Sequence, residues 1–233
     1  MPSAPSAAWP SPYCLRPMSA AASRFAAALS LALTAGCAAP VPPALPDAAC
    51  VAIASDFGRD DDMNGDRRSG LHGGIDFKAP RATPAIAAAP GTVVELQSNP
   101  NTRGGLAVVI HHGNAPDGRE IWSYYGHLED FRTAVGEKVS RGQIVGLVGN
   151  TGWSMPKWRH FHLHFEVYAR APDAGRRSIV NPHALWFPLG QAGRRIGPAA
   201  EAKDSGDAGF SGFTHPLPCD GWKSSAAGAI SAR

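Results

Sequence analysis

The chain has 233 residues, and its 26 Gly and 21 Pro interrupt regular structure too often for long helices. Of the 22 Lys and Arg, two lie before residue 38, whereas all 19 Asp and Glu lie after it, so the rest of the chain is nearly neutral. This balance gives no general case for binding nucleic acid, and the length after residue 37 suits one domain with a hydrophobic core.

The N-terminal segment has the features of an export signal. Met18 to Arg24 is a short basic start, Phe25 to Leu33 is an apolar stretch too short to span a bilayer, and Thr34-Ala-Gly-Cys37 resembles a lipobox. We therefore expect residues 1–37 to be a signal segment, with Met18 as the true start. A lipid on Cys37 would tether an exported, periplasmic protein to the outer membrane. A plain secretory signal, cut at one of the Ala residues, is the alternative.

The cysteines predict one disulfide. Cys14 lies in the signal segment and Cys37 would carry lipid, which leaves Cys50 and Cys219 near the two ends of the remaining chain. In an oxidising compartment such a pair is expected to join, and on the loop-entropy model the bridge contributes roughly 4–5 kcal/mol. Two free buried thiols are the alternative.

Two segments without a regular hydrophobic pattern flank the central part of the chain. Residues 38–48, rich in Pro and Ala, predict a semi-extended tether. Residues 189–233 predict an irregular C-terminal extension that Cys219 pins, with disorder past Trp222.

Short strands separated by Gly, Pro and Asn turns dominate the middle of the chain. Leu106 to Ile110 is continuously apolar, as expected of a strand buried on both faces. Gly142 to Gly152 is rich in glycine but lacks the Lys-Ser/Thr pair of a phosphate-binding loop, so we interpret it as a strand with tight turns. The predicted strands are Gly91–Leu96, Leu106–His111, Ile121–Leu128, Ile144–Val148 and His162–Tyr168.

Three histidine segments in this region are candidates for a functional site. In His72-Gly-Gly-Ile-Asp76 the two glycines predict a bend that turns His72 and Asp76 toward one point, with a strand starting at Ile75. His127 follows an aromatic segment and Gly126, where we expect the strand to end and to place the imidazole at the rim of a groove.

His162 and His164 form the third segment. Residues two apart on a strand share a face, so both imidazoles would face one cleft, while Leu163 and Phe165 point into a core. Two His and one Asp can supply three ligands to zinc and leave a fourth position open, and two further imidazoles can move protons or stabilise an oxyanion. We expect the remaining histidines to be bystanders: His111, His112, His160, His183 and His215. His160 lies two residues before His162, so the alternative is that it shares the face of His162.

These segments, in this order, resemble peptidase family M23, the lysostaphin-type zinc metallopeptidases that cut peptide bridges in bacterial cell walls. The resemblance runs from about Ser55 to Pro182. It implies a domain over residues 49–188 that is mainly β, with antiparallel sheets forming a barrel-sandwich-like fold with an open groove. The motifs that carry it include Asp56-Phe57-Gly58, His72-Gly-Gly-Ile-Asp76, Val108-Val-Ile-His-His-Gly113, Tyr125-Gly-His-Leu128, Gly149-Asn-Thr-Gly152, His162-Leu-His-Phe-Glu166 and Asn181-Pro182.

The resemblance implies that His72, Asp76 and His164 hold zinc and that His127 and His162 are the catalytic residues. We favour His162 as the base and His127 as the oxyanion stabiliser. The implied reaction is hydrolysis of amide bonds in peptidoglycan stems or cross-bridges by attack of a metal-bound water, without a covalent intermediate.

Two segments depart from the family pattern, and both are expected to border the groove. Met155 to Phe161 is bulky and basic, and its Lys157 and Arg159 are candidates for contacts with stem-peptide carboxylates. Arg59 to Gly70 is unusually charged. Trp153 and Trp158 are candidates for walls of the groove.

Three other functions stay open at this point. The domain could bind peptidoglycan or activate an amidase without catalysis while retaining a zinc site, it could hold a structural zinc, or it could cut a peptide outside the cell wall. The complete set of ligands, with two spare imidazoles beside it, favours an active endopeptidase, since structural zinc sites usually have four protein ligands.

Overall fold

The computed structural model describes residues 50–152, 160–189, 196–199, 202, 204 and 209–219. The chain separates into two units, residues 1–43 and 44–233, and every described residue lies in the second unit. The predicted signal, lipid site and tether therefore lie outside the described residues, as do Trp153, Lys157, Trp158 and Arg159 and the end of the chain past Trp222. Among the described residues, no helix has the length and apolar character needed to cross a membrane.

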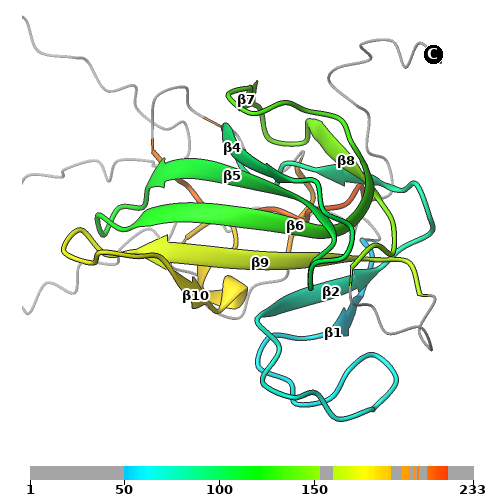
Figure 1. Ribbon diagram of the computed structural model, residues 1–233. Coiled ribbons are helices and arrows are strands. Elements are labelled where there is room, and N and C mark those ends of the chain that lie inside the picture. The colour runs from blue at the N-terminus through cyan, green and yellow to red at the C-terminus, as the bar shows by residue number, and fades with distance from the viewer. Residues whose placement is uncertain are drawn as a thin grey trace, which may run out of the picture. The chain divides into compact units, whose positions relative to one another are not determined.

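The described residues form ten strands and one short 3-10 helix (Figure 1). This confirms the prediction of a mainly β, antiparallel domain, because every strand pair is antiparallel. The elements are β1 (Ile53–Ser55), β2 (Gly74–Lys78), β3 (Pro84–Ile86), β4 (Gly91–Gln97), β5 (Leu106–Asn114), β6 (Glu120–Phe131), β7 (Lys138–Val139), β8 (Ile144–Val148), β9 (His162–Arg170), β10 (Ser178–Val180) and the 3-10 helix Pro182–Leu185.

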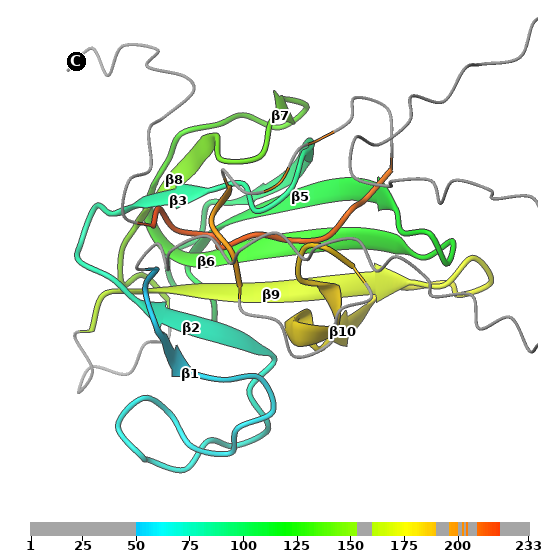
Figure 2. The same cartoon turned by 180° about the vertical axis from the view of Figure 1, so that it is seen from behind.

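All ten strands are hydrogen-bonded into one branched sheet. Its main path runs β1-β2-β9-β6-β5-β4-β7, while β10 pairs with β9, and β8 pairs with both β6 and β3. Figure 1 shows the long strands β5, β6 and β9 side by side, and Figure 2 shows β3 and β8 from behind. Because β9 lies between β2 and β6, segments that are far apart in the sequence become neighbours at the centre of the sheet.

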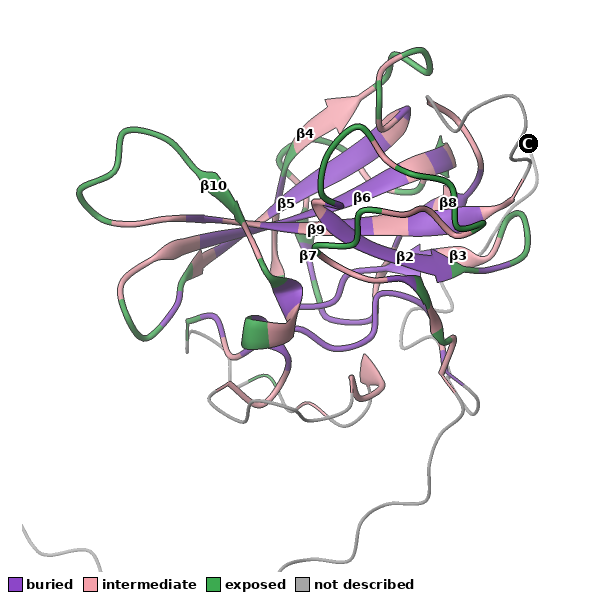
Figure 3. Cartoon of the chain, turned by 90° about the horizontal axis from the view of Figure 1, so that it is seen from below, coloured by how far each residue is buried: buried purple, intermediate pink, exposed green. Residues whose placement is uncertain are grey.

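The core lies against one face of this sheet. Leu163, Phe165 and Val167 on β9 are fully buried and pack with Ile75 and Phe77 of β2, and burial of each large apolar side chain contributes about 1.5–3 kcal/mol. Figure 3 shows the buried residues concentrated along the long central strands. The opposite face carries a smaller buried cluster of Ala107, Val109, Trp122 and Tyr124, with Tyr168 packed beside it.

The five predicted strands are confirmed, and β5 is buried on both faces along Ala107 to Ile110 as expected. One detail was wrong: β6 does not end at His127 but continues to Phe131. His127 instead has a left-handed backbone with φ of 60°, and the pairing register of β6 with β8 shifts between Leu128 and Asp130. The strand therefore changes direction at His127 without ending there.

The C-terminal part of the chain packs onto the sheet through more than one contact. The predicted disulfide between Cys50 and Cys219 is present. In addition, Arg141, whose side chain is only 2% exposed, forms hydrogen bonds to Asp204 at 2.8 Å and to the carbonyl oxygen of Gly212 at 3.0 Å. Phe213 is fully buried in the core, so this segment is part of the folded unit.

Candidate metal centre

Strand pairing brings the three histidine segments together. In the antiparallel pair β2 and β9, Asp76 lies opposite His164, and on the other side of β9, His164 lies opposite Gly126, the residue before His127. His72 lies just before β2. His162 and His164 share the face of β9 that is turned away from Leu163 and the core, as their spacing predicted.

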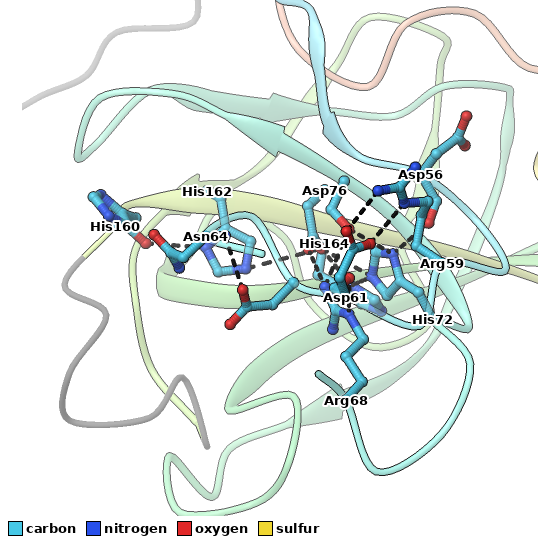
Figure 4. Close-up of polar contacts among 12 residues, drawn as sticks. Asp56, Arg59, Asp61, Asn64, Arg68, His72, Asp76, His160, His162 and His164 are labelled. Carbon is cyan, nitrogen blue, oxygen red and sulfur yellow. Dashed lines mark hydrogen bonds and ion pairs between the residues drawn. The ribbon is translucent and has the colours of Figure 1, made fainter. Parts of the chain in front are cut away.

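Three ligand atoms converge on one point. His72 Nε2 lies 3.1 Å from His164 Nδ1 and 3.2 Å from Asp76 Oδ1, and the latter two atoms are 2.7 Å apart (Figure 4). Ligands of a tetrahedral zinc lie about 3.3 Å from one another, since each is about 2.0–2.1 Å from the metal. The three atoms therefore fit a zinc ion after a small outward adjustment, and they form the one candidate metal-binding group among the described residues.

The outer nitrogens of both ligand histidines are held by oxygen atoms. His72 Nδ1 donates to the carbonyl oxygen of Asp56 at 2.8 Å, and His164 Nε2 donates to Glu166 Oε1 at 2.8 Å. A carbonyl or carboxylate oxygen accepts only, so these bonds fix which nitrogen carries the proton. His72 consequently offers Nε2 to a metal, and His164 offers Nδ1.

The two remaining histidines are oriented in the same way. His127 Nδ1 donates to the carbonyl oxygen of Thr151 at 2.7 Å, and His162 Nδ1 donates to the carbonyl oxygen of His160 at 3.0 Å. The two rings lie 4.6 Å apart between centroids. In the neutral form each ring therefore keeps Nε2 unprotonated and free to accept a proton.

Asp76 and His164 carry opposite charges at the centre. Burial opposes ionisation of Asp76, but the hydrogen bond from His164 and the contact with His72 hold its pKa well below the usual range. Burial also opposes the charge on His164, yet its bonds to Asp76 and Glu166 raise its pKa to about 9. A cation among the three ligand atoms would take the place of the Nδ1 proton that faces Asp76.

Burial has the opposite result at the two spare imidazoles. It lowers the pKa of His127 to about 3, with nearby His162 acting in the same direction. It also lowers the pKa of His162, although Asp76 opposes this. Both rings are therefore neutral near pH 7, and neutral imidazoles can act as proton acceptors.

The glycines of the His72 segment have a different role from the predicted bend. Neither Gly73 nor Gly74 has a positive φ. A Cβ on Gly74 would instead lie 2.5 Å from the carbonyl oxygen of Phe165 and 2.8 Å from Cγ of Glu166, and one on Gly73 would lie 3.0 Å from Oε1 of Glu166. The glycines are needed for the close approach of β9 and its side chains.

The charged segment Arg59 to Gly70 reaches the centre through Arg68. The Arg68 guanidinium donates to Asp76 Oδ2 and to Ser55 Oγ, both at 3.2 Å, and its Nε donates to the carbonyl oxygen of Asp61 at 2.9 Å. Figure 4 shows Arg68 beside Asp76 and His164. Arg68 thus holds the Asp76 oxygen that does not face His164, a contact that the sequence pattern did not indicate.

The five bystander histidines lie outside the ligand group. His112 and His215 are buried and form hydrogen bonds to oxygens away from it, and His183 bonds to Asp56 Oδ1 at 2.7 Å. His160 contributes only a backbone oxygen. Like Arg68, Glu166 had no role assigned to it from the sequence, although period-two alternation along β9 places it on the face of His164.

The part of the chain that carries this site is similar in sequence to known proteins. The model of peptidase family M23 matches residues 70–182. Over 122 residues the chain is 39% identical to the peptidoglycan DD-endopeptidase ShyA of Vibrio cholerae. This aligned region covers 52% of this chain and 26% of ShyA. Over 112 residues it is 35% identical to the DD-carboxypeptidase/endopeptidase Mpg of Neisseria meningitidis. This aligned region covers 48% of this chain and 23% of Mpg.

A solved structure is similar over nearly its full length. The catalytic domain of the prophage-encoded M23 protein EnpA from Enterococcus faecalis, crystallised as a mutant, is 34% identical and has a TM-score of 0.44. The similarity covers 57% of this chain and 88% of that domain. The match to ShyA and Mpg, in contrast, spans only about a quarter of the length of those two proteins.

Proposed function

This chain belongs to peptidase family M23, and from that premise we propose that it is a zinc-dependent endopeptidase that hydrolyses amide bonds in the peptide stems or cross-bridges of peptidoglycan. In this proposal His72, Asp76 and His164 hold zinc, and His127 and His162 are catalytic. The observation that supports it most is the convergence of three ligand atoms with two neutral imidazoles beside them.

The donor set favours zinc and an open centre. Two imidazole nitrogens and one carboxylate oxygen are ligands that zinc prefers, and a site with three protein ligands keeps a position free for chemistry. When bound, zinc supplies a Lewis acid that polarises a carbonyl and makes water more acidic. The chain itself orients the ligands, through the main-chain oxygen of Asp56 and the carboxylate of Glu166, and buries His72 and Asp76.

We propose that His162 accepts the proton of the attacking water and that His127 stabilises the oxyanion. The Nε2 of His162 is a proton acceptor, since its Nδ1 is bonded to the carbonyl oxygen of His160. His127 can donate to an oxyanion only if Nε2 carries a proton in addition to the one on Nδ1; this extra proton comes from solvent, and the negative charge that develops on the tetrahedral oxygen favours its binding. The proton taken from water can then pass to the leaving amine.

The test is mass spectrometry of the fragments that the protein releases from purified cross-linked peptidoglycan. The protein starting at Ala38 is incubated with and without a zinc chelator, and His127→Ala serves as the catalytic control. We expect loss of cross-linked dimers that the chelator and the variant both abolish, and the fragment masses identify the bond. If a folded, zinc-loaded protein releases no peptidoglycan fragments, the proposed endopeptidase activity is refuted. That result would favour the alternative, a wall-binding or amidase-activating domain.

We also propose that the protein is exported to the periplasm and anchored in the outer membrane by a lipid on Cys37. The Cys50–Cys219 disulfide supports an oxidising compartment, and the lipobox-like Thr34-Ala-Gly-Cys37 supports lipidation. We keep residues 1–37, 38–48, 49–188 and 189–233 as the proposed signal, tether, peptidase domain and extension. Metabolic labelling with a palmitate analogue tests the anchor, because Cys37→Ser should lose the label and an unlabelled wild-type protein would refute it.

A further inference from the structure

Consecutive hydrogen bonds connect the metal centre with residues farther along β9, on the face turned away from the main core. His164 Nε2 donates to Glu166 Oε1 at 2.8 Å, and the hydroxyl of Tyr168 donates to Glu166 Oε2 at 2.5 Å. The Glu166 side chain is only 13% exposed. Both of its oxygens therefore have partners, and one of those partners is a metal-ligand candidate.

This chain of contacts follows from the geometry of the sheet. His164, Glu166 and Tyr168 alternate with core residues on β9, so their side chains lie in a row on one face. On the next strand across the sheet, Gly74 lies opposite Glu166. Because a Cβ at Gly74 would lie 2.8 Å from Cγ of Glu166 and 3.0 Å from Cε1 of His164, the glycine provides the space in which the two side chains meet.

The outer end of the row is also fixed. The guanidinium of Arg177 lies 5.0 Å from the ring centroid of Tyr168, and the same group pairs with Glu95 on β4 at 3.6 Å. The cation over its ring therefore helps to hold Tyr168 while the Tyr168 hydroxyl donates to Glu166. This leaves Glu166 little freedom to rotate away from His164.

We propose that Glu166 is a positioning residue of the metal centre, which holds His164 with Nδ1 toward Asp76, and that Tyr168 holds Glu166 in turn. The inference rests on the proposed function, because it assumes that His164 is a zinc ligand. Carboxylates behind ligand histidines fix the ring and make it a better donor, and their loss typically weakens metal binding about 10–100-fold. Glu166 provides both effects, orientation and negative charge.

Substitutions can separate these two effects. Glu166→Gln keeps the shape and an acceptor oxygen for His164 but removes the charge, whereas Glu166→Ala removes both. Tyr168→Phe leaves Glu166 charged and removes only its outer hydrogen bond. Glu120→Gln is the matched control, since Glu120 lies on the same face of the sheet but bonds to Arg170.

The experiment measures the zinc dissociation constant of each protein by competition with a chromophoric chelator at pH 7.5, and the thermal unfolding midpoint in excess chelator. We expect zinc binding to weaken about 10-fold in Glu166→Gln and up to about 100-fold in Glu166→Ala. Tyr168→Phe should lose less than Glu166→Gln, and Glu120→Gln should bind zinc like the wild type. The unfolding midpoint in chelator should change little in Glu166→Gln.

Several outcomes would overturn the proposal. Unchanged zinc affinity in the Glu166 variants would do so, as would an equal loss in Glu120→Gln, which would assign the effect to the general charge of the sheet face. If Glu166→Ala fails to fold, Glu166→Gln and Tyr168→Phe still decide. A wild-type protein that binds zinc but releases no wall fragments would refute the proposed function and leave this inference intact, whereas a wild-type protein that binds no zinc would refute both.

Discussion

Replacement of His112 by Gln should remove a large part of the acid sensitivity of the fold. His112 is buried, its Nδ1 donates to the carbonyl oxygen of Pro90 at 2.7 Å, and its Nε2 accepts from Ser123 Oγ at 2.7 Å. Burial, assisted by the positive charge of Arg141, lowers the pKa of His112 to about 3. The unfolded chain has an ordinary histidine pKa of about 6.5.

The sign and the size of the effect follow from linkage. Between pH 6.5 and 3 the unfolded state binds the proton and the folded state does not, so the free energy of unfolding falls as the pH falls. From pH 7.5 to 5.0 this loss amounts to about 2 kcal/mol for His112 alone. Gln can donate to Pro90 and accept from Ser123 but cannot be protonated, so His112→Gln should lose about 2 kcal/mol less than the wild type over this interval.

The assay is urea unfolding at pH 7.5 and 5.0, at constant ionic strength and with a chelator present to exclude metal linkage. Other histidines titrate in both proteins, so their contributions cancel in the difference. Ser123→Ala keeps the buried imidazole and should retain the full pH dependence. An equal decrease in the unfolding free energy of the wild type and His112→Gln would refute the reasoning.

Three further changes test other parts of the structure. His72→Ala should lose bound zinc, whereas His127→Ala should keep zinc and lose at least about 100-fold in turnover, as metal analysis and the wall-fragment assay will measure. The Cys50→Ser/Cys219→Ser double variant should lose up to about 5 kcal/mol in urea unfolding, because the bridge closes a sequence separation of 169 residues, and an unchanged midpoint would contradict this. Arg141→Ala should lower the free energy of unfolding by about 1–3 kcal/mol and expose the C-terminal segment to limited proteolysis, because the buried carbonyl oxygen of Gly212 loses its donor and Asp204 loses its ion pair. Digestion like that of the wild type would contradict the role of Arg141 in holding this segment.

The strands could be predicted because their signals are local. Alternation along His162 to Tyr168 reports which side of a strand each residue occupies, and the unbroken apolar run from Leu106 to Ile110 reports burial on both sides. The grouping of His72, Asp76 and His164 was predicted by resemblance to a family. Alternation alone does not say that β9 lies between β2 and β6.

The contacts that support the centre could not be predicted, because they depend on which strands become neighbours. Gly74 looked like a bend, but its role depends on Glu166 across the sheet, nearly a hundred positions later in the chain. Arg68 lies in a charged loop, where a surface location is the ordinary expectation, yet it bonds to Asp76. Such pairings are specified by the tertiary arrangement and leave no periodic signal in one sequence.

The oxygen atoms that accept hydrogen bonds from the four histidines differ in how readily a mutation can remove them. Three of them, at Asp56, Thr151 and His160, belong to the main chain. Every amino acid carries such an oxygen, so these three positions can accept new side chains during evolution while the backbone keeps its path. The fourth oxygen belongs to the Glu166 side chain, and a single base change can remove it. For the proposed enzyme, loss of activity in descendants could therefore begin at Glu166 while all five histidine and aspartate positions remain intact. A search that inspects only those five positions would still count such a descendant as active.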